Sequence, residues 1–255
     1  MELVNYTVDN AVATITLNRP PVNALNSDLI GDLAEAFSMA ADPSVRAVVV
    51  TGTPHFAAGA DITRFQAAFD AGADDRQASG LTEVIDALER LEKPTIAAVV
   101  GYALGGGLEL SMGADFRYLA EGAKVGQPEI RLGLIPGAGG TQRLARIVGP
   151  QRCKEMCMTG RQVGADEALS IGLADKVAPD DEVLSLALAD AARYAKGPTK
   201  AYAAVKAAVR IGYDMPLAGG IGIEAEQFGV AFRTDDARIG VGAFIAKEKP
   251  EFTGR

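Results

Sequence analysis

The chain reads TIAAVVGYALGGGLEL over residues 95–110 and GQPEIRLGLIPGAGG over residues 126–140, and these two stretches decide its fold. The apolar run from Thr95 to Val100 is short, rich in β-branched residues and bounded by proline and glycine, which predicts a buried strand. Three glycines, 105–107, follow it, and a helix-like run starts near Leu108. Glycine in such a turn lets another backbone or a ligand approach closely.

The start of that helix offers unpaired N–H groups at the positive end of the helix dipole, which stabilises an oxyanion. Glu109 lies one turn into the helix, and Glu129 follows twenty residues later, directly after Pro128. Two carboxylates beside such a turn favour acid–base chemistry on a carbonyl compound. Each feature alone also fits a structural role, because glycines permit tight packing and a first-turn glutamate complements the dipole.

The glycines do not follow the pattern of a dinucleotide-binding turn, which is G-x-G-x-x-G. Counted from Gly105, the third glycine would fall at Leu110, and counted from Gly137 it would fall at Gln142. Glu109 would also stand where a pyrophosphate binds, and its charge would repel that group. The sequence therefore argues against a dinucleotide cofactor.

Composition limits the class of protein. The 255 residues are 48% hydrophobic, which suffices for one domain with a sizeable core, or one domain with a helical appendage. The net charge of −8 disfavours nucleic acid or an anionic membrane as a partner. Cys153 and Cys157, four residues apart with a single histidine in the chain, make a poor zinc set and an improbable disulfide. No signal peptide or membrane-spanning run is apparent, so we expect a metal-free cytoplasmic protein.

Strand and helix patterns alternate through the first half of the chain. Residues 2–8 and 11–17 read as a hairpin around Asp9 and Asn10, and a helix follows from Asn26 or Ser27 to about Ala41. A strand from Arg46 to Thr51 leads into FAAGAD, residues 56–61, a small-residue loop placed like the glycines after Val100. Two such loops would bring two backbone N–H groups to one point. Repeated strand–helix units imply a parallel sheet.

The stretch 64–80 is the least determined, and we expect it to line a ligand pocket or to be poorly ordered, against the alternative of a plain surface loop. A helix is expected at 81–91 and short strands at 116–120, 124–125 and 174–177. The pattern beyond Thr141 is otherwise helical, with helices expected at 141–148, 150–158, 165–171, 180–195, 198–211, 216–232 and 235–246. The alanine- and glycine-rich faces of the last helices must pack on the core or on another subunit, which favours an oligomer.

Three blocks, FAAGAD (56–61), VGYALGGGLEL (100–110) and GQPEIRLGLIPGAGGTQRL (126–144), resemble the enoyl-CoA hydratases of the crotonase family, and the resemblance extends over essentially the whole chain. It implies an α/β fold: a spiral of ββα turns over residues 1–195 and a C-terminal helical trimerisation region over 196–255. It also implies a homotrimer, often paired into a hexamer, and an acyl-CoA thioester as the substrate, with no cofactor.

By motif position, the resemblance places the two oxyanion-binding N–H groups at Ala60 and Gly106. It implies that Glu109 activates water and that Glu129 supplies the α-proton. The residues implied to contact the substrate are Ala58, Ala60, Asp61, Ile62, Gly106, Gly137 and Lys247. The chain departs from the family where lysines are common, with Pro54 and Thr63 in their place, so the contacts to the CoA phosphates are not carried over. Arg64, Lys247 and Lys249 are the candidates that remain.

The resulting prediction is an enoyl-CoA hydratase, which adds water reversibly and syn to a trans-2-enoyl-CoA. One alternative is a Δ3-Δ2 enoyl-CoA isomerase, which needs mainly the carboxylate at Glu129, whereas the presence of Glu109 argues for hydration. A second is a non-catalytic acyl-CoA-binding protein, whose relatives lose one or both glutamates. A third is an RNA-binding member, which the charge of −8 disfavours. Neither chain length nor pathway follows from the residues.

Overall fold

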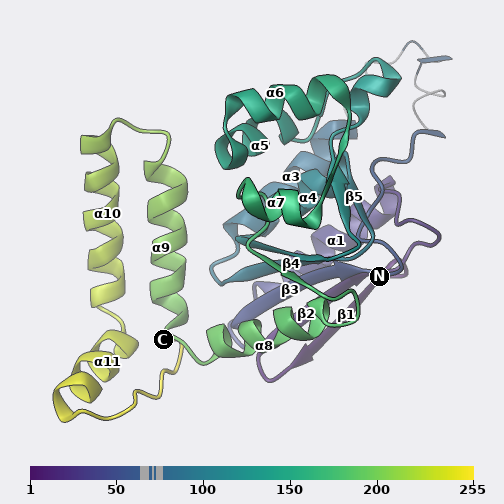
Figure 1. Ribbon diagram of the computed structural model, residues 1–255. Helices are drawn as coiled ribbons and strands as arrows, with labels where there is room; N and C mark the ends of the chain where they lie inside the picture. The colour runs from purple at the N-terminus through teal and green to yellow at the C-terminus, as the bar shows by residue number, and fades with distance from the viewer. Residues whose placement is uncertain (64–68, 71, 73–76) are drawn as a thin grey trace.

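The computed structural model describes residues 1–63, 69–70, 72 and 77–255, and its core is built on two sheets (Figure 1). The larger sheet has the strand order β1-β2-β3-β4-β6-β9, and the smaller has the order β5-β7-β8. The strands of the larger sheet are β1 (Val4–Asp9), β2 (Val12–Leu17), β3 (Ala47–Gly52), β4 (Thr95–Val99), β6 (Phe116–Ala120) and β9 (Lys176–Ala178). Those of the smaller are β5 (Tyr102–Leu104), β7 (Lys124–Gly126) and β8 (Gln162–Gly164).

The expected hairpin is present, and the strands that follow it are parallel. β1 pairs antiparallel with β2, and the pairs β2–β3, β3–β4, β4–β6 and β6–β9 are all parallel. The two residues between β1 and β2 are Asn10 and Ala11, both at positive φ (48° and 63°), as a two-residue hairpin turn that follows the strand twist requires. The turn is therefore one residue later than Asp9–Asn10.

Successive turns of the chain place one strand in each sheet. β4 lies in the large sheet and β5 in the small one, and β6 and β7 repeat this order, with β5 and β7 parallel to each other. Ala57, after β3, forms a parallel bridge to Ala103 of β5 and so extends the small sheet by one turn. The apolar residues of β3 and β4 are buried throughout, which explains their continuous Val/Ile/Ala runs. The architecture is the predicted α/β spiral.

Helices cover both sheets and carry the site. Those of the core are α1 (Ser27–Ala40), α3 (Gln77–Arg90), α4 (Gly106–Met112), α5 (Gly140–Val148), α6 (Pro150–Thr159), α7 (Ala165–Ser170), α8 (Val183–Ala195) and the 3₁₀ turn η1 (Glu129–Leu132). α1 is capped by Asn26, whose side chain accepts from the Leu29 N–H, as the sequence predicts. α8 packs on the large sheet through β2, β3, β4 and β6.

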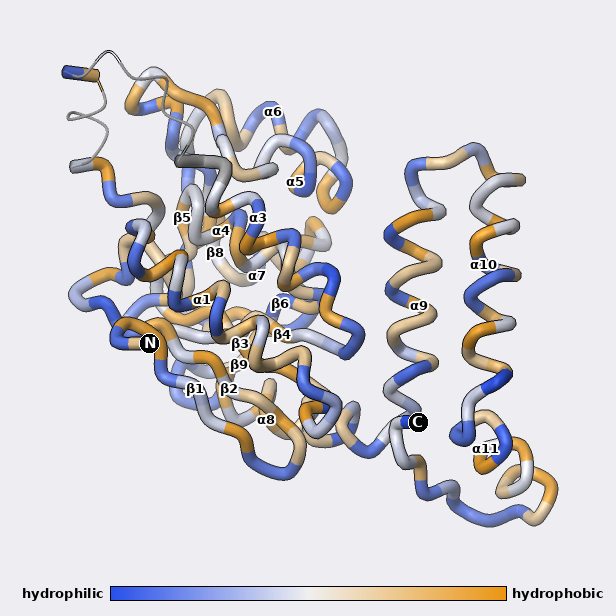
Figure 2. Tube along the Cα trace, turned by 180° about the vertical axis from the view of Figure 1, so that it is seen from behind, coloured by the Kyte–Doolittle hydropathy of each residue, from blue (hydrophilic) through white to orange (hydrophobic). Residues whose placement is uncertain are grey.

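The last three helices form an arm that stands beside the core in Figures 1 and 2. They are α9 (Thr199–Gly212), α10 (Leu217–Phe232) and α11 (Asp235–Ala246), and α10 packs mainly on α9. Polar contacts join the arm to the core. Lys206 of α9 pairs with Asp115 at 2.8 Å, and Arg46 at the start of β3 donates to the carbonyls of Gly197 and Phe252. Asp236 accepts from the Thr253 and Gly254 N–H groups and so holds the chain end at the base of the arm.

Several predicted boundaries were wrong. The helix expected from Leu108 begins at Gly106, the helix expected from Leu81 begins at Gln77, and the strand expected at 174–177 lies at Lys176–Ala178. The strands β5 and β8 were not predicted, and both are defined by their pairing with β7. Most of the stretch 64–80, expected to line a pocket or to be poorly ordered, lies outside the described residues.

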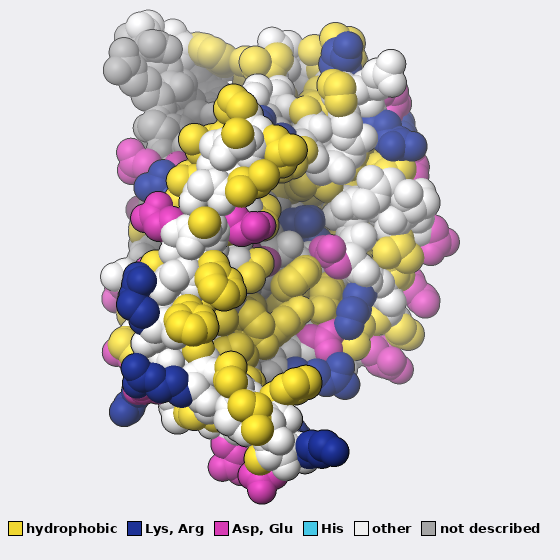
Figure 3. Space-filling view, turned by 90° about the vertical axis from the view of Figure 1, so that its left-hand side faces the viewer, with side chains coloured by type: hydrophobic (Ala, Val, Ile, Leu, Met, Phe, Trp, Pro, Cys, Tyr) yellow, Lys and Arg dark blue, Asp and Glu magenta, His cyan; other side chains and the backbone are white. Residues whose placement is uncertain are grey.

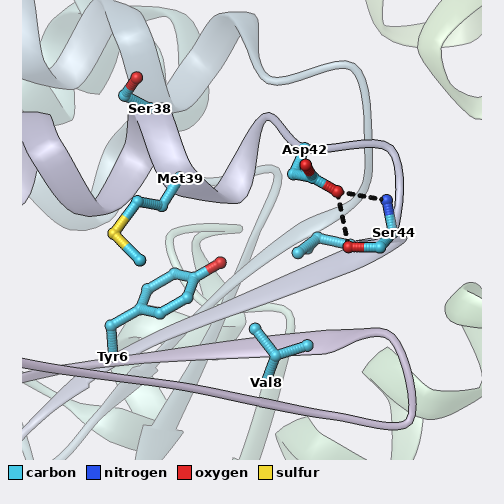
Figure 4. Close-up of a pocket in the computed structure, with 7 residues that line it drawn as sticks. Tyr6, Val8, Ser38, Met39, Asp42 and Ser44 are labelled. Atoms are coloured by element: carbon cyan, nitrogen blue, oxygen red, sulfur yellow. Dashed lines mark hydrogen bonds between the residues drawn. The ribbon is translucent and has the colours of Figure 1, made fainter.

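A surface groove of about 420 Å³ opens between β1 and the C-terminal end of α1. Its lining residues are Tyr6, Val8, Ser38, Met39, Asp42, Ser44 and Val45. Figure 4 shows Asp42 accepting from both the N–H and the hydroxyl of Ser44, at 2.8 and 2.6 Å, while Tyr6, Met39 and Val8 supply apolar walls. None of the predicted site residues comes from these elements, so the groove is separate from the predicted chemistry.

Candidate active site

Glu109 is the most deeply placed of the predicted site residues. It is the fourth residue of α4 and is 3% exposed. Its Oε1 accepts hydrogen bonds from the N–H groups of Ala138 (2.8 Å) and Gly140 (2.7 Å), in the glycine-rich turn that leads into α5. Burial raises the pKa of Glu109, and the two N–H donors and the Arg143 guanidinium oppose that rise by favouring the anion. Glu109 is thus a buried carboxylate with two backbone donors and a nearby guanidinium.

Glu129 opens η1 directly after Pro128 and is half-buried. Burial, partly opposed by its own backbone N–H and reinforced by the nearby Glu109, raises the pKa of Glu129 to about 7. A methyl group built on Gly105 would lie 2.9 Å from Glu129 Oε1, so this carboxylate lies against the turn that starts α4. A carboxyl group with this pKa holds a proton at neutral pH often enough to donate it.

Gln127 binds Glu129 and lies near Glu109. It is completely buried, and with its amide nitrogen directed at Glu129 it donates to both carboxylate oxygens, at 2.9 and 3.2 Å. A methyl group built on Gly140 would lie 2.6 Å from the Gln127 amide and 2.8 Å from Glu109 Oε1, so Gly140 leaves room for both side chains. Gln127 lies within a motif block but was not predicted as a site residue, although a buried amide two residues before a carboxylate is a usable signal.

The two predicted oxyanion donors lie next to each other. Gly106 is the first residue of α4, so its N–H has no partner within the helix, and a methyl group built on it would lie 3.8 Å from the Ala60 nitrogen. The strand-like pairing of residues 59–61 with Leu25 uses the Gly59 carbonyl and the Asp61 N–H, which turns the Ala60 N–H to the other side. Among the described residues, neither N–H has a hydrogen-bond partner.

Two glycines make this approach possible. Gly105 has φ 53° and ψ −124°, a conformation that residues with a side chain rarely adopt, and Gly59 has φ 97°. The residue after Gly106 is packed just as tightly, because a methyl group on Gly107 would overlap the Ala57 carbonyl. The structural role that the sequence allowed for these glycines therefore exists, and it serves to bring Ala60 and Gly106 together.

The remaining residues predicted to contact the substrate differ in their exposure and hydrogen bonding. Ala58 is half-buried and gives its N–H to the Val22 carbonyl, and Gly137 is exposed beside the turn that binds Glu109. Asp61 accepts from the Thr63 hydroxyl (2.7 Å) and from Arg19 (2.7 Å), which lowers its pKa. The bond from Arg19 also ties the loop to the segment before α1. Ile62 is 54% exposed and free to meet a ligand.

Lys247 lies apart from this cluster. It ends α11 on the arm, in the left-handed conformation, whereas α4 and η1 belong to the core (Figure 1). Of the other phosphate candidates, Arg64 lies outside the described residues, and Lys249 follows Lys247 beyond the end of α11. Within one chain, therefore, no lysine of the arm reaches the two glutamates.

The described part of the chain contains no group of three or more His, Cys, Asp or Glu side chains that would bind a metal ion. No helix there has the length and apolar character needed to cross a bilayer. Cys153 and Cys157 are both free thiols.

The sequence of this chain is similar to those of known proteins over nearly its whole length. The family model described as enoyl-CoA hydratase/isomerase matches residues 7–255. The chain belongs to the enoyl-CoA hydratase/isomerase family. It is 40% identical to the crotonyl-CoA hydratase of Syntrophomonas wolfei over 97% of this chain and 96% of that protein. It is 41% identical to the mitochondrial enoyl-CoA hydratase of Pongo abelii, over 96% of this chain and 84% of that protein.

Solved structures of this family share the fold. The enoyl-CoA hydratase of Bacillus anthracis superposes with a TM-score of 0.91 at 34% identity, over 99% of this chain and 100% of that one. An enoyl-CoA hydratase/isomerase structure from Mycobacterium abscessus gives a TM-score of 0.93 at 33% identity, over 99% and 100% of the two chains. The predicted family and fold are thereby confirmed.

Proposed function

We propose that this chain is an enoyl-CoA hydratase, which adds water to the double bond of a trans-2-enoyl-CoA and gives a 3-hydroxyacyl-CoA. One observation carries the proposal: two carboxylates with different environments lie beside two unpartnered N–H groups. Glu109 accepts two backbone hydrogen bonds that favour its anion, and Glu129 has a pKa raised to about 7. The relatives named crotonyl-CoA hydratase and enoyl-CoA hydratase support the same activity.

The reaction uses each part of the cluster once. The thioester oxygen accepts hydrogen bonds from the Ala60 and Gly106 N–H groups, which stabilise the negative charge that builds on it as a nucleophile adds at the β-carbon. Glu109 takes a proton from the attacking water, so the oxygen of that water forms its bond to the β-carbon. The electrons of the double bond move toward the thioester carbonyl, and Glu129 delivers a proton to the α-carbon. Glu129 lies against the turn that starts α4, the helix that carries Glu109, so both carboxylates would act from one side of the double bond, as syn addition requires.

Isomerisation of a Δ3 double bond would use one carboxylate to move a proton between two carbons. The second carboxylate, Glu109 with its two N–H donors, has no task in that reaction, which favours hydration. A binding protein without activity would have no need of two buried carboxylates, because burying an ionisable group costs stability.

We propose that the enzyme is a homotrimer or a pair of trimers. The arm supports this assembly, because α10 buries none of its residues in the single chain and Leu217, Phe244 and Ile245 are 80%, 85% and 76% exposed. Hydrophobic side chains also gather on the face that bears the arm in Figure 3. An adjoining subunit would bring its own arm, and with it Lys247, toward a core. A cytoplasmic location remains a prediction from the sequence, in keeping with the free thiols of Cys153 and Cys157.

The test is turnover of trans-2-enoyl-CoAs of graded chain length, followed by loss of absorbance of the conjugated thioester. Glu109→Gln and Glu129→Gln keep size and hydrogen bonding but do not exchange a proton usefully, so each is expected to lose about 100- to 10,000-fold in kcat. The double variant is expected to lose far less than the product of the two, because the pair acts as a unit. Full turnover in Glu109→Gln with none in Glu129→Gln would indicate an isomerase instead. Binding of acyl-CoA without turnover at any chain length would indicate a binding protein.

A further inference from the structure

Arg143 on α5 joins three parts of the molecule that meet beside Glu109. Its Nη2 pairs with Asp86 (2.6 Å) and Glu89 (2.8 Å) of α3, and its Nε donates to Glu89 at 3.1 Å. The remaining nitrogen, Nη1, donates to the carbonyl of Ala138 at 3.2 Å. The side chain is 18% exposed, so most of the guanidinium is enclosed by these partners.

The Ala138 carbonyl belongs to the turn that holds Glu109. The N–H groups of Ala138 and Gly140 both donate to Glu109 Oε1, and Arg143 binds the opposite side of the same turn. Between them, Gly139 has φ 95°, and a side-chain carbon there would overlap Arg143 Nη1. The Arg143 N–H also donates to the Gly139 carbonyl at 2.8 Å. The turn is thus held between the carboxylate on one side and the guanidinium on the other.

We propose that Arg143 is a positioning residue for Glu109: anchored on α3 by Asp86 and Glu89, its guanidinium sets the Ala138–Gly140 turn so that two N–H groups meet one carboxylate oxygen. The planar fork of arginine suits this task, because it satisfies two carboxylates and a carbonyl at fixed angles. The inference rests on the proposed function, since it concerns the group that accepts the proton from water.

Glu109 interacts with three titratable or charged groups on the elements packed around it. Glu129 on η1 disfavours a negative charge on Glu109, whereas Arg143 on α5 favours that charge. The third group is the Cys157 thiol on α6. Burial and the nearby Cys153 raise the pKa of Cys157 to about 12, so this thiol is uncharged at neutral pH. Burial raises the pKa of Glu109, and the two N–H donors and the guanidinium oppose that rise.

The first test is Arg143→Met, with Arg146→Met as its matched control. Loss of the guanidinium is expected to lower kcat for hydration by about 10- to 100-fold with little change in KM, because the base is displaced and substrate contacts are kept. In a plot of kcat against pH, the acid limb is expected to move to higher pH, because the ionised form of Glu109 loses a nearby positive charge. Arg146 lies one turn further along α5, is 46% exposed and pairs with Asp214, so its variant is expected to behave as the unmodified enzyme.

Two further variants separate positioning from charge alone. Arg143→Lys keeps the charge without the fork, and an intermediate loss of kcat is expected. Glu89→Gln removes a negative charge but loosens the anchor. If Arg143 acted only through its charge, loss of the Glu89 charge would favour the Glu109 anion, and the acid limb of the pH profile would move to lower pH. If Arg143 positions the turn, a looser anchor would weaken the N–H bonds to Glu109, and the acid limb would move to higher pH. These variants decide the matter even if Arg143→Met does not fold.

The pKa of Glu109 can be measured without substrate, so this proposal can be tested independently of the proposed function. The Glu109 carboxyl is titrated in the free enzyme by carbon-13 NMR, its resonance assigned by its absence in Glu109→Gln. A higher pKa of Glu109 in Arg143→Met and Glu89→Gln supports the positioning role, even if no enoyl-CoA were hydrated and the proposed function failed. An unchanged pKa of Glu109 in Arg143→Met, or a lower one in Glu89→Gln, overturns it.

Discussion

Glu109 and Glu129 are the same residue type on different elements, and their surroundings support the different tasks that we propose for them. Glu109 has two backbone donors and a nearby guanidinium, all of which favour the anion against the effect of burial. Glu129 receives the Gln127 amide and faces Glu109, and its pKa is raised to about 7. Two carboxyl groups in such different environments suit an acid and a base in one site.

The rate of hydration is therefore expected to show a bell-shaped dependence on pH. Because Glu129 must hold its proton to protonate the α-carbon, kcat/KM should fall as pH rises through about 7, the pKa of Glu129. Because Glu109 must be ionised, kcat/KM should also fall on the acid side. The measurement is kcat/KM for one enoyl-CoA from pH 5 to 10. A rate that keeps rising to pH 9 would contradict the assignment of Glu129 as the acid.

At the scale of elements, the first turn of α4 has two duties. It presents the Gly106 N–H, the proposed oxyanion donor, and it lets Gly107 pack on the Ala57 carbonyl. The N–H belongs to Gly106 and the close packing to Gly107, so substitution of one glycine tests one role without the other.

Gly106→Pro removes the donor at a helix position where proline is tolerated. We expect a folded protein whose kcat is about 100- to 1000-fold lower, the usual cost of losing one oxyanion donor. Gly106→Ala is the control, since it keeps the N–H while adding a carbon 2.9 Å from the flexible end of Leu81. Equal losses in the two variants would show that crowding, and not the missing donor, is responsible.

Lys93, between α3 and β4, closes the end of α1. Its Nζ donates to the carbonyls of Ala40 (2.7 Å), Asp42 (2.9 Å) and Val45 (2.9 Å), and the side chain is almost fully buried. Burial lowers the pKa of Lys93 to about 8, so the ammonium is still charged at neutral pH. It satisfies carbonyls at the end of α1 and in the loop that follows.

Lys93→Met leaves those three carbonyls without this donor, and we expect the free energy of unfolding to fall by about 2–4 kcal/mol at pH 7. Urea denaturation followed by circular dichroism measures it. Lys200→Met is the matched control, because Lys200 is 51% exposed and its pairing with Glu92 is worth less than about 1 kcal/mol. A loss no larger than that of the control would mean that water replaces the ammonium without cost.

At the scale of the whole molecule, the arm exposes more apolar surface than a single chain in water normally carries. α9 is covered by α10 on one side only, and no residue of α10 is buried. Large apolar side chains recur along all three helices of the arm, and the exposed ones include Val205, Val209, Leu217, Phe228, Phe232, Phe244 and Ile245.

The protein is expected to be a trimer or a multiple of three at micromolar concentration, as measured by light scattering. Replacing Leu217 and Phe244 together with Asp should shift it toward monomer, because two charges would be buried in the contact. Leu169→Asp on α7, where the side chain is 45% exposed, is the control and should keep the assembly. A stable monomer of the unmodified protein would contradict the proposed assembly.

Local features of the sequence determined much of this molecule. The buried run before the glycines predicted β4, the Asn26 cap predicted the start of α1, and the helical periods from Thr141 onward predicted α5 to α11 within a few residues. These signals lie within a window of about ten residues, where periodicity and capping act. The resemblance of three motif blocks then predicted the family, the fold and Glu109 with Glu129.

Only the tertiary structure decided how those parts meet. The strands β5 and β8 exist because β7 pairs with both, and Arg143 became part of the site through Asp86 and Glu89, more than fifty residues earlier. The proton affinities of the two glutamates depend on burial and on donors brought by distant segments, such as the Ala138 N–H that reaches Glu109 from 29 residues away. The period of apolar residues shows which side of its own helix or strand a residue lies on. It does not show which other helix or strand the fold will pack against that side.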